Sequence, residues 1–167
     1  MAQENERVPK RYYVWGDTGT GKTLFAQTLS EKKGSKMYIK SLSKAWNNYK
    51  DEKVVLLEVN SRESWKYIRN QLGKWLDYYE FETGDVVDRM TKEVVKEGGM
   101  LDAKKYDMVI TSYHPLEYFL DNEKVDESQG HLSDREVEKI KRLIEVHEMT
   151  NRDIKEIRKD IEKIISN

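Results

Sequence analysis

The stretch GDTGTGKT, residues 16–23, matches the spacing G-x-x-x-x-G-K-[ST] at every fixed position. Glycines let a backbone wrap closely around a phosphate, so that successive N–H groups point at it. Lys22 is then expected to reach the β- and γ-phosphates, and the Thr23 hydroxyl to lie on Mg²⁺. The pattern predicts a site for a nucleoside triphosphate, taken as ATP, with Mg²⁺. The residues assigned to the nucleotide are Gly16, Asp17, Thr18, Gly19, Thr20, Gly21, Lys22 and Thr23.

Such a loop must lie between a strand that ends at its first glycine and a helix that begins near its lysine. Residues 11–15, RYYVW, are β-branched and aromatic and predict the strand. Apolar residues at helical spacing in KTLFAQTLS, residues 22–30, predict the helix. The flanking sequence therefore provides both elements.

The rest of the chain continues to alternate between strand and helix patterns. Further strands are expected at 36–40, 53–59 and 106–113, with a short strand pair or hairpin within 85–101. Amphipathic helices are expected over 61–79, 133–148 and 151–167. This order predicts a three-layer α/β domain with a mostly parallel central sheet and C-terminal amphipathic helices.

Two of the helix predictions make specific statements about single residues. The apolar face of the helix over 61–79 is expected to continue as far as Tyr79. Ser133 and Glu136 have the spacing of a capping box, and the buried face of the helix that they start is expected to run from Val137 to His147.

Composition narrows the class of protein. The 167 residues fit one domain, and 30 basic against 31 acidic side chains mean that nucleic-acid binding would need a local basic cluster. The chain has no cysteine for disulfides or thiolate metal sites, and His114, His131 and His147 follow no metal-ligand spacing. No apolar run reaches the roughly 20 residues of a membrane span. We expect a cytoplasmic protein, or one of the nucleus or cytoplasm of a host cell if it is viral.

Beyond the phosphate loop, the chain resembles the superfamily 3 helicase domain of rolling-circle replication initiator (Rep) proteins of circular single-stranded DNA viruses and related plasmids. The stretches that carry the resemblance are YYVWGDTGTGKT, KAWNNYKDEKVVLLEV and DMVITSYHPLEYF, which follow one another in the order of that family. The resemblance implies a P-loop NTPase domain of the AAA-like kind over residues 11–148. Residues 1–10 are then expected to be a flexible lead-in, and 149–167 a C-terminal helix.

The resemblance also implies roles for single residues. Trp46 and Tyr49 look like the family's Trp-x-x-Tyr element. Glu58 is similar to the Walker B acid, which holds Mg²⁺ through water and acts in catalysis. Arg142 lies in a segment similar to the one that carries the family's arginine. The counterparts of the sensor residues, which would contact the nucleotide, are Thr111 and Ser112.

In that family, the domains assemble into a ring, usually a hexamer, that moves single-stranded or unwinding DNA through a central pore. The pore-facing hairpin corresponds to about residues 82–102 here. Its basic side chains could follow the phosphates of DNA. The candidate nucleic-acid contacts are Arg89, Lys92 and Lys96.

The sequence departs from the family's pattern at two positions. Walker B strands normally end in two adjacent acids, yet VVLLEVN offers only Glu58, with Leu57 or Val59 in the place of the partner acid. The sensor asparagine is also missing, because Tyr113 follows Ser112 directly. These departures predict nucleotide binding with impaired hydrolysis.

Two other functions fit parts of the pattern. A nucleotide-binding assembly module without hydrolysis would explain the missing acid and asparagine. A small P-loop kinase would have a similar length and a similar N-terminal motif, but it usually needs an arginine-rich lid, and Arg135–Arg142 is sparse and lysine-rich.

Overall fold

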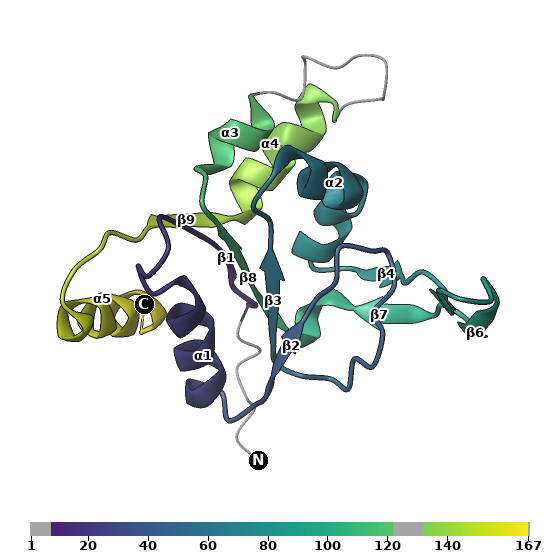
Figure 1. The fold of residues 1–167 in the computed structure, drawn as a ribbon, viewed down its shortest axis with the longest axis horizontal. Coiled ribbons are helices and arrows are strands. Elements are labelled where there is room, and N and C mark those ends of the chain that lie inside the picture. Colours follow the sequence, from purple (N-terminus) through teal and green to yellow (C-terminus); the bar gives the residue numbers. More distant parts are fainter. Residues whose placement is uncertain (1–7, 122–131, 167) are drawn as a thin grey trace.

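A computed structural model of the protein describes residues 8–121 and 132–166. Five strands form one sheet in the order β2-β3-β8-β1-β9, with every neighbouring pair parallel (Figure 1). The strands are β1 (Arg11–Trp15), β2 (Met37–Ile39), β3 (Val54–Glu58), β8 (Asp107–Ser112) and β9 (Glu145–Glu148). This confirms the predicted α/β class with a parallel central sheet, which is consistent with a P-loop NTPase fold.

Helices cover both faces of the sheet, so that consecutive residues of β3 and β8 are buried on both sides. One face packs against α2 (Arg62–Leu76), α3 (Leu116–Leu120) and α4 (Asp134–Leu143), and the other against α1 (Lys22–Lys32) and α5 (Ile154–Ile165). Side chains alternate along each strand, so Leu57 belongs to the α2 side and Leu56 to the α1 side. The result is the predicted three-layer arrangement.

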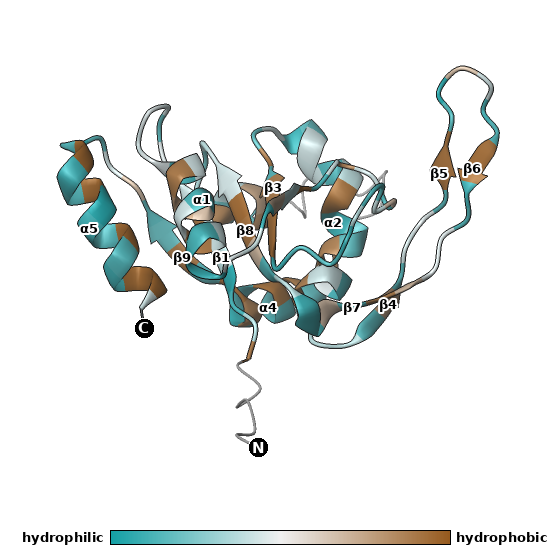
Figure 2. Ribbon diagram, turned by 90° about the horizontal axis from the view of Figure 1, so that it is seen from below, coloured by the Kyte–Doolittle hydropathy of each residue, from teal (hydrophilic) through white to brown (hydrophobic). Residues whose placement is uncertain are grey.

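A long antiparallel ribbon extends beyond the layers at the end of the molecule opposite α5 and β9 (Figure 2). Its base pairs β4 (Glu80–Glu82) with β7 (Met100–Asp102), and its outer part pairs β5 (Val86–Val87) with β6 (Val94–Lys96). A short 3₁₀ turn, η1 (Ala103–Lys105), then leads into β8. This ribbon is the hairpin predicted within 85–101, extended at its base.

The predicted helix over 133–148 is wrong in its second half. Ser133 caps α4 with the expected capping box, but the helix ends at Leu143 and the chain turns extended at Ile144. The following residues form β9 beside β1, so His147 lies against Phe25 of α1 instead of continuing the α4 face. A free edge of β1 offers unpaired backbone groups, and pairing with them outweighs the helical pattern of this segment.

Tyr79 also differs from its prediction. Helix α2 ends at Leu76, where Asp77 takes an extended conformation, and Tyr79 lies beyond the helix with 74% of its surface exposed. Residues 1–7 of the predicted lead-in and His131 lie outside the described residues. No helix within 8–121 and 132–166 is long and apolar enough to cross a membrane.

A buried lysine joins β2 to the aromatic side of the core. Lys40 is 3% exposed, and its Nζ donates to the carbonyl oxygens of Ser41 (3.0 Å), Ser43 (2.6 Å) and Ala45 (2.8 Å). The same ammonium lies 4.5 Å from the ring centre of Trp75. Burial lowers the pKa of Lys40 to about 7.

Lys40 should make the stability of the protein depend on pH. Between about pH 7 and the ordinary lysine value of 10.5, the unfolded chain holds a proton that folded Lys40 has released, so the free energy of unfolding should increase as the pH rises. Urea unfolding at pH 7, 8 and 9 measures this, with Lys40→Met as the variant that should lose the trend. Lys36→Met, at an exposed position, is the control and should keep it. Parallel curves for the native protein and Lys40→Met would contradict the prediction.

Candidate functional site

The loop after β1 is held open towards solvent at the carboxyl end of the sheet. The Gly16 N–H donates to the Ser112 carbonyl oxygen at the end of β8 (3.1 Å), which fixes the start of the loop. Gly21 takes a left-handed conformation (φ 93°) as the N-cap of α1 and provides no side-chain cap. The first N–H groups of α1 are therefore available to an anion. A Cβ added at Gly19 would meet nothing within 4 Å, so space remains beside the loop.

The rear of the loop rests on the C-terminal part of the chain. A Cβ added at Gly21 would lie 2.6 Å from Cγ2 of Ile157 in α5, and one added at Gly16 would collide with the Met149 carbonyl oxygen. Glycine at these positions thus allows close packing as well as left-handed turns. Sequence reasoning missed this support, because the isoleucine spacing of α5 indicates a packing face without identifying its partner.

Lys22 is half-buried and bent back onto its own loop. Its Nζ donates to the carbonyl oxygens of Gly16 and Asp17 and lies 4.1 Å from the ring centre of Tyr113. Burial lowers the pKa of Lys22, against the raising effect of the negative charges of Glu58 and Asp17. A phosphate would offer this ammonium stronger acceptors than the carbonyls that it now contacts.

Glu58 is the acid on the phosphate-loop side of β3. It is exposed at the end of the strand and, by the alternation of side chains, faces the same side of the sheet as α1. Leu57 and Val59 are fully buried on the opposite side, in the α2 core. An acid introduced at either position would enter that core and would not reach the loop. Replacing Leu57 or Val59 by an acid would therefore not restore a second acid at the site.

The predicted sensor residues lie on β8 between β1 and β3, and both are buried. Thr111 pairs with Glu58 across the strands, and its carbonyl oxygen accepts from the Val59 N–H (2.9 Å). Ser112 Oγ accepts from the His114 N–H (3.1 Å). The structure thus brings Thr111, Ser112 and Glu58 to the same edge of the sheet as the phosphate loop.

Thr20 and Thr23 differ in what their hydroxyl groups do. Thr20 is buried, and its Oγ1 donates to the Asp17 carbonyl oxygen (2.8 Å), which stabilises the loop. Thr23 is exposed in the first turn of α1, as a metal ligand beside bound phosphates needs to be. Asp17 and Thr18 are exposed on the outside of the loop. Together with Glu58, this set of oxygen donors fits a nucleotide with Mg²⁺.

Arg142 lies at the opposite end of the sheet. It is exposed at the end of α4, just before β9 begins beside Tyr12. Along β1, this end is about 13 Å from the phosphate loop. Its charge acts on Asp77. Partial burial raises the pKa of Asp77, but the hydrogen bond from Lys139, the Tyr78 N–H and the charges of Lys139 and Arg142 together lower it by more. The pKa of Asp77 is therefore lowered overall.

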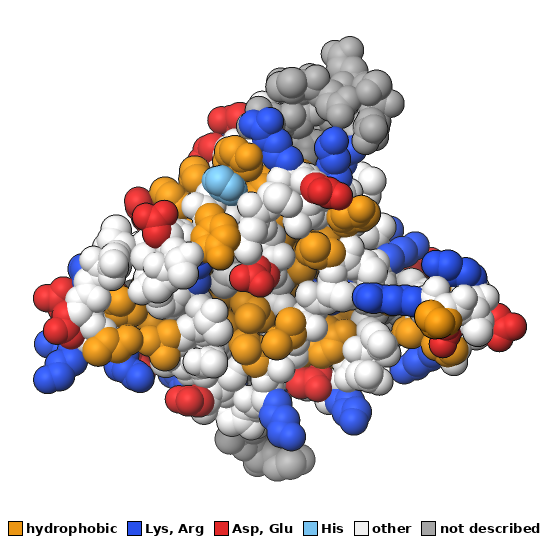
Figure 3. Space-filling model, viewed as in Figure 1, with side chains coloured by type: hydrophobic (Ala, Val, Ile, Leu, Met, Phe, Trp, Pro, Cys, Tyr) orange, Lys and Arg blue, Asp and Glu red, His pale blue; other side chains and the backbone are white. Residues whose placement is uncertain are grey.

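The hairpin carries the candidate nucleic-acid residues, but in two different settings. Arg89 and Lys92 are exposed in the turn between β5 and β6, where Asp88 Oδ1 accepts from the N–H groups of Met90 (2.8 Å) and Thr91 (3.0 Å). Basic and acidic side chains are interspersed at this end of the molecule (Figure 3).

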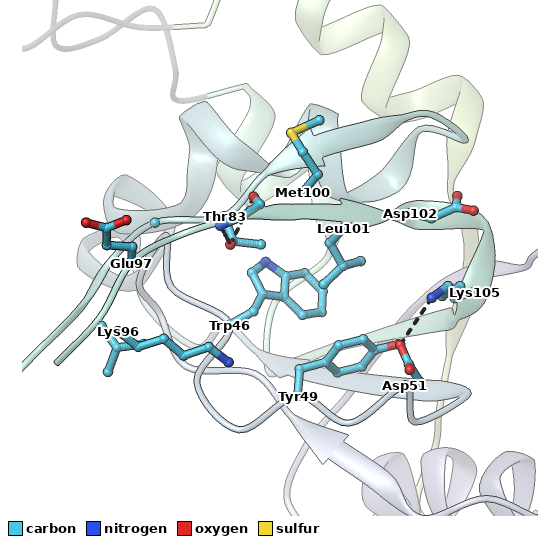
Figure 4. Close-up of a pocket in the computed structure, with 13 residues that line it drawn as sticks. Trp46, Tyr49, Asp51, Thr83, Lys96, Glu97, Met100, Leu101, Asp102 and Lys105 are labelled. Atoms are coloured by element: carbon cyan, nitrogen blue, oxygen red, sulfur yellow. Dashed lines mark hydrogen bonds and ion pairs between the residues drawn. The ribbon is translucent and has the colours of Figure 1, made fainter. Parts of the chain in front are cut away.

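Lys96 instead lines a pocket of about 270 Å³ where the ribbon meets the body. Figure 4 shows its side chain beside Trp46, with Tyr49 and the Lys105–Asp51 ion pair (3.4 Å) further along the pocket. Trp46 itself is buried and stacks on Tyr38 with a centre distance of 5.7 Å. The Trp-x-x-Tyr element therefore has a structural place, in the aromatic cluster that anchors the ribbon.

Comparison with known families supports the nucleotide site. Residues 12–59 match a family model described as RNA helicase, which is less than half of the chain. The matched segment runs from β1 to just past β3 and so contains the phosphate loop and Glu58. No curated protein matches the sequence. The chain thus contains a helicase-like, nucleotide-binding segment on a P-loop α/β fold.

Proposed function

We propose that this chain is the ATP-driven motor domain of a superfamily 3 helicase of the Rep type, which binds Mg-ATP and moves on single-stranded DNA. The observation that carries the proposal is the uncapped start of α1 beside Lys22, with Glu58 exposed at the same edge of the sheet. The match of residues 12–59 to a helicase family supports a motor over other nucleotide-binding proteins.

Each residue of the site has a part in this function. The N–H groups of the loop and of the first turn of α1 hold the phosphates, and Lys22 turns from the Gly16 and Asp17 carbonyls to the β- and γ-phosphates. Thr23 and, through water, Glu58 would hold Mg²⁺, which supplies positive charge to the phosphate oxygens when bound. Because β3 ends in a single acid, Glu58, with no acid on either side of it in the strand sequence, we expect slow hydrolysis.

An assembly of several copies is part of the proposal, and the hairpin supports it. An isolated two-stranded ribbon is marginal in water, and this one exposes apolar side chains along its length. Met90 at its tip is 92% exposed. Contact with neighbouring subunits or with a nucleic acid in a central pore would cover these side chains, with Arg89, Lys92 and Lys96 contacting phosphates.

Arg142 fits a role between subunits. Its place at the amino end of the sheet keeps it away from the phosphate loop of its own chain, so it can only act on the nucleotide of a neighbour. A guanidinium presented in this way would stabilise the charge that develops on the γ-phosphate. Hydrolysis would then depend on assembly.

The alternative is a nucleotide-binding assembly module that does not hydrolyse ATP. The observation that favours it is that Leu57 and Val59 are both buried away from the phosphate loop. Such a module would keep the same fold and the same nucleotide site.

Measuring ATP hydrolysis with and without single-stranded nucleic acid decides between these functions. We expect a low rate that single-stranded DNA raises several-fold, because the hairpin couples DNA to the ring. Arg89→Ala/Lys92→Ala should lose this stimulation, whereas the control Lys155→Ala/Lys159→Ala, which removes two exposed charges from α5, should keep it.

ATP binding without turnover would favour the assembly module. Stimulation by RNA alone would reject DNA as the track, and stimulation by a small hydroxyl acceptor would indicate a kinase.

A further inference from the structure

Asn60 lies at the nucleotide edge of the sheet, two residues after Glu58. It is half-buried in the turn that leads from β3 into α2. The backbone N–H of Tyr113, which follows β8, donates to its Oδ1 (3.3 Å). The asparagine side chain therefore links the ends of two neighbouring strands, β3 and β8.

The bond from Tyr113 determines how the carboxamide is oriented. A backbone N–H can only be accepted by the oxygen of the amide, so the NH₂ group must point the other way. Within residues 8–121 and 132–166, no hydrogen bond engages Nδ2 of Asn60. Two N–H donors are thus held in a defined direction at this edge.

Tyr113 connects Asn60 to Lys22, the lysine of the phosphate loop. The ring of Tyr113 lies against Nζ of Lys22, with 4.1 Å from the nitrogen to the ring centre. Lys22 in turn feels the charge of Glu58. Asn60, Tyr113, Lys22 and Glu58 therefore form one continuous group beside the open loop.

We propose that Asn60 recognises the γ-phosphate of the bound nucleotide through Nδ2. The inference rests on the proposed nucleotide site and adds a residue to it. The position just after β8 where the Rep pattern has an asparagine holds Tyr113 here, and the carboxamide comes from the turn after β3 instead. A neutral amide cannot act as a base at physiological pH, so its part is to distinguish a triphosphate from a diphosphate.

Asn60→Asp tests this role without removing the contact to Tyr113. Aspartate has the same shape and still accepts the Tyr113 N–H, but it replaces the NH₂ donor by an acceptor that repels phosphate. We expect the affinity for the Mg-bound β,γ-imido analogue of ATP to fall about tenfold or more, and that for Mg-ADP to change less than about threefold. Calorimetric titration of both ligands gives the ratio.

Two further variants make the result specific. Asn70→Asp adds the same charge at an exposed position of α2 and should leave both affinities unchanged. Asn60→Ala removes the donor without adding charge and should also reduce selectivity for the triphosphate analogue. An equal loss for both nucleotides, or no loss, would overturn the role of Asn60 while leaving the nucleotide site intact. If the native protein binds neither nucleotide, the proposed function fails and this inference with it.

Discussion

Lys22→Ala is expected to lower the affinity for Mg-ATP by about a hundredfold or more while the protein stays folded. The ammonium neutralises phosphate charge, and its loss leaves the loop with only backbone donors. Folding should be little affected, because the contacts of Lys22 to the Gly16 and Asp17 carbonyls lie at a half-buried surface.

Calorimetric titration with Mg-ATP measures the loss, and Lys36→Ala, an exposed lysine just before β2, is the matched control. Unchanged affinity in Lys22→Ala would reject the nucleotide site.

The same variant tests the role of Arg142. Lys22→Ala subunits and Arg142→Ala subunits are each expected to be inactive alone, and mixing the two should recover part of the ATP hydrolysis. No recovery in rings shown to be mixed would remove Arg142 from the site.

Ile161→Ala should destabilise the protein by about 2–5 kcal/mol. Ile161 is fully buried in the core between α5 and α1, so the shorter side chain leaves a cavity there. Because Ile157 of the same helix packs against Gly21, loosening α5 should also weaken nucleotide binding.

Urea unfolding measures the stability, and titration with Mg-ATP measures the binding. Ile154→Ala is the control in the same helix: Ile154 is 54% exposed, and its replacement should change stability little. If both variants unfold at the same urea concentration, α5 is not part of the domain core. If Ile161→Ala is unstable but binds Mg-ATP as tightly as the native protein, the helix does not support the loop.

The amino-acid sequence by itself determined the class of the fold and the phosphate loop. Both depend on local information: a glycine pattern with a strand before it and a helix after it, and continuous apolar runs that need two covered faces. The capping box of Ser133 was equally readable, because its hydrogen bonds join residues three apart.

Tertiary structure decided which segments complete the site. Residues 145–148 became β9 because the edge of β1 was available for pairing, although their local pattern continued a helix. Tyr113 and Asn60 are brought together only because β3 and β8 are neighbours in the sheet. Ile157 and Met149 support the loop from more than a hundred residues away in the chain, at glycines whose lack of a side chain permits the approach. Contacts of this kind depend on how the layers pack, which the spacing of residues along one segment does not encode.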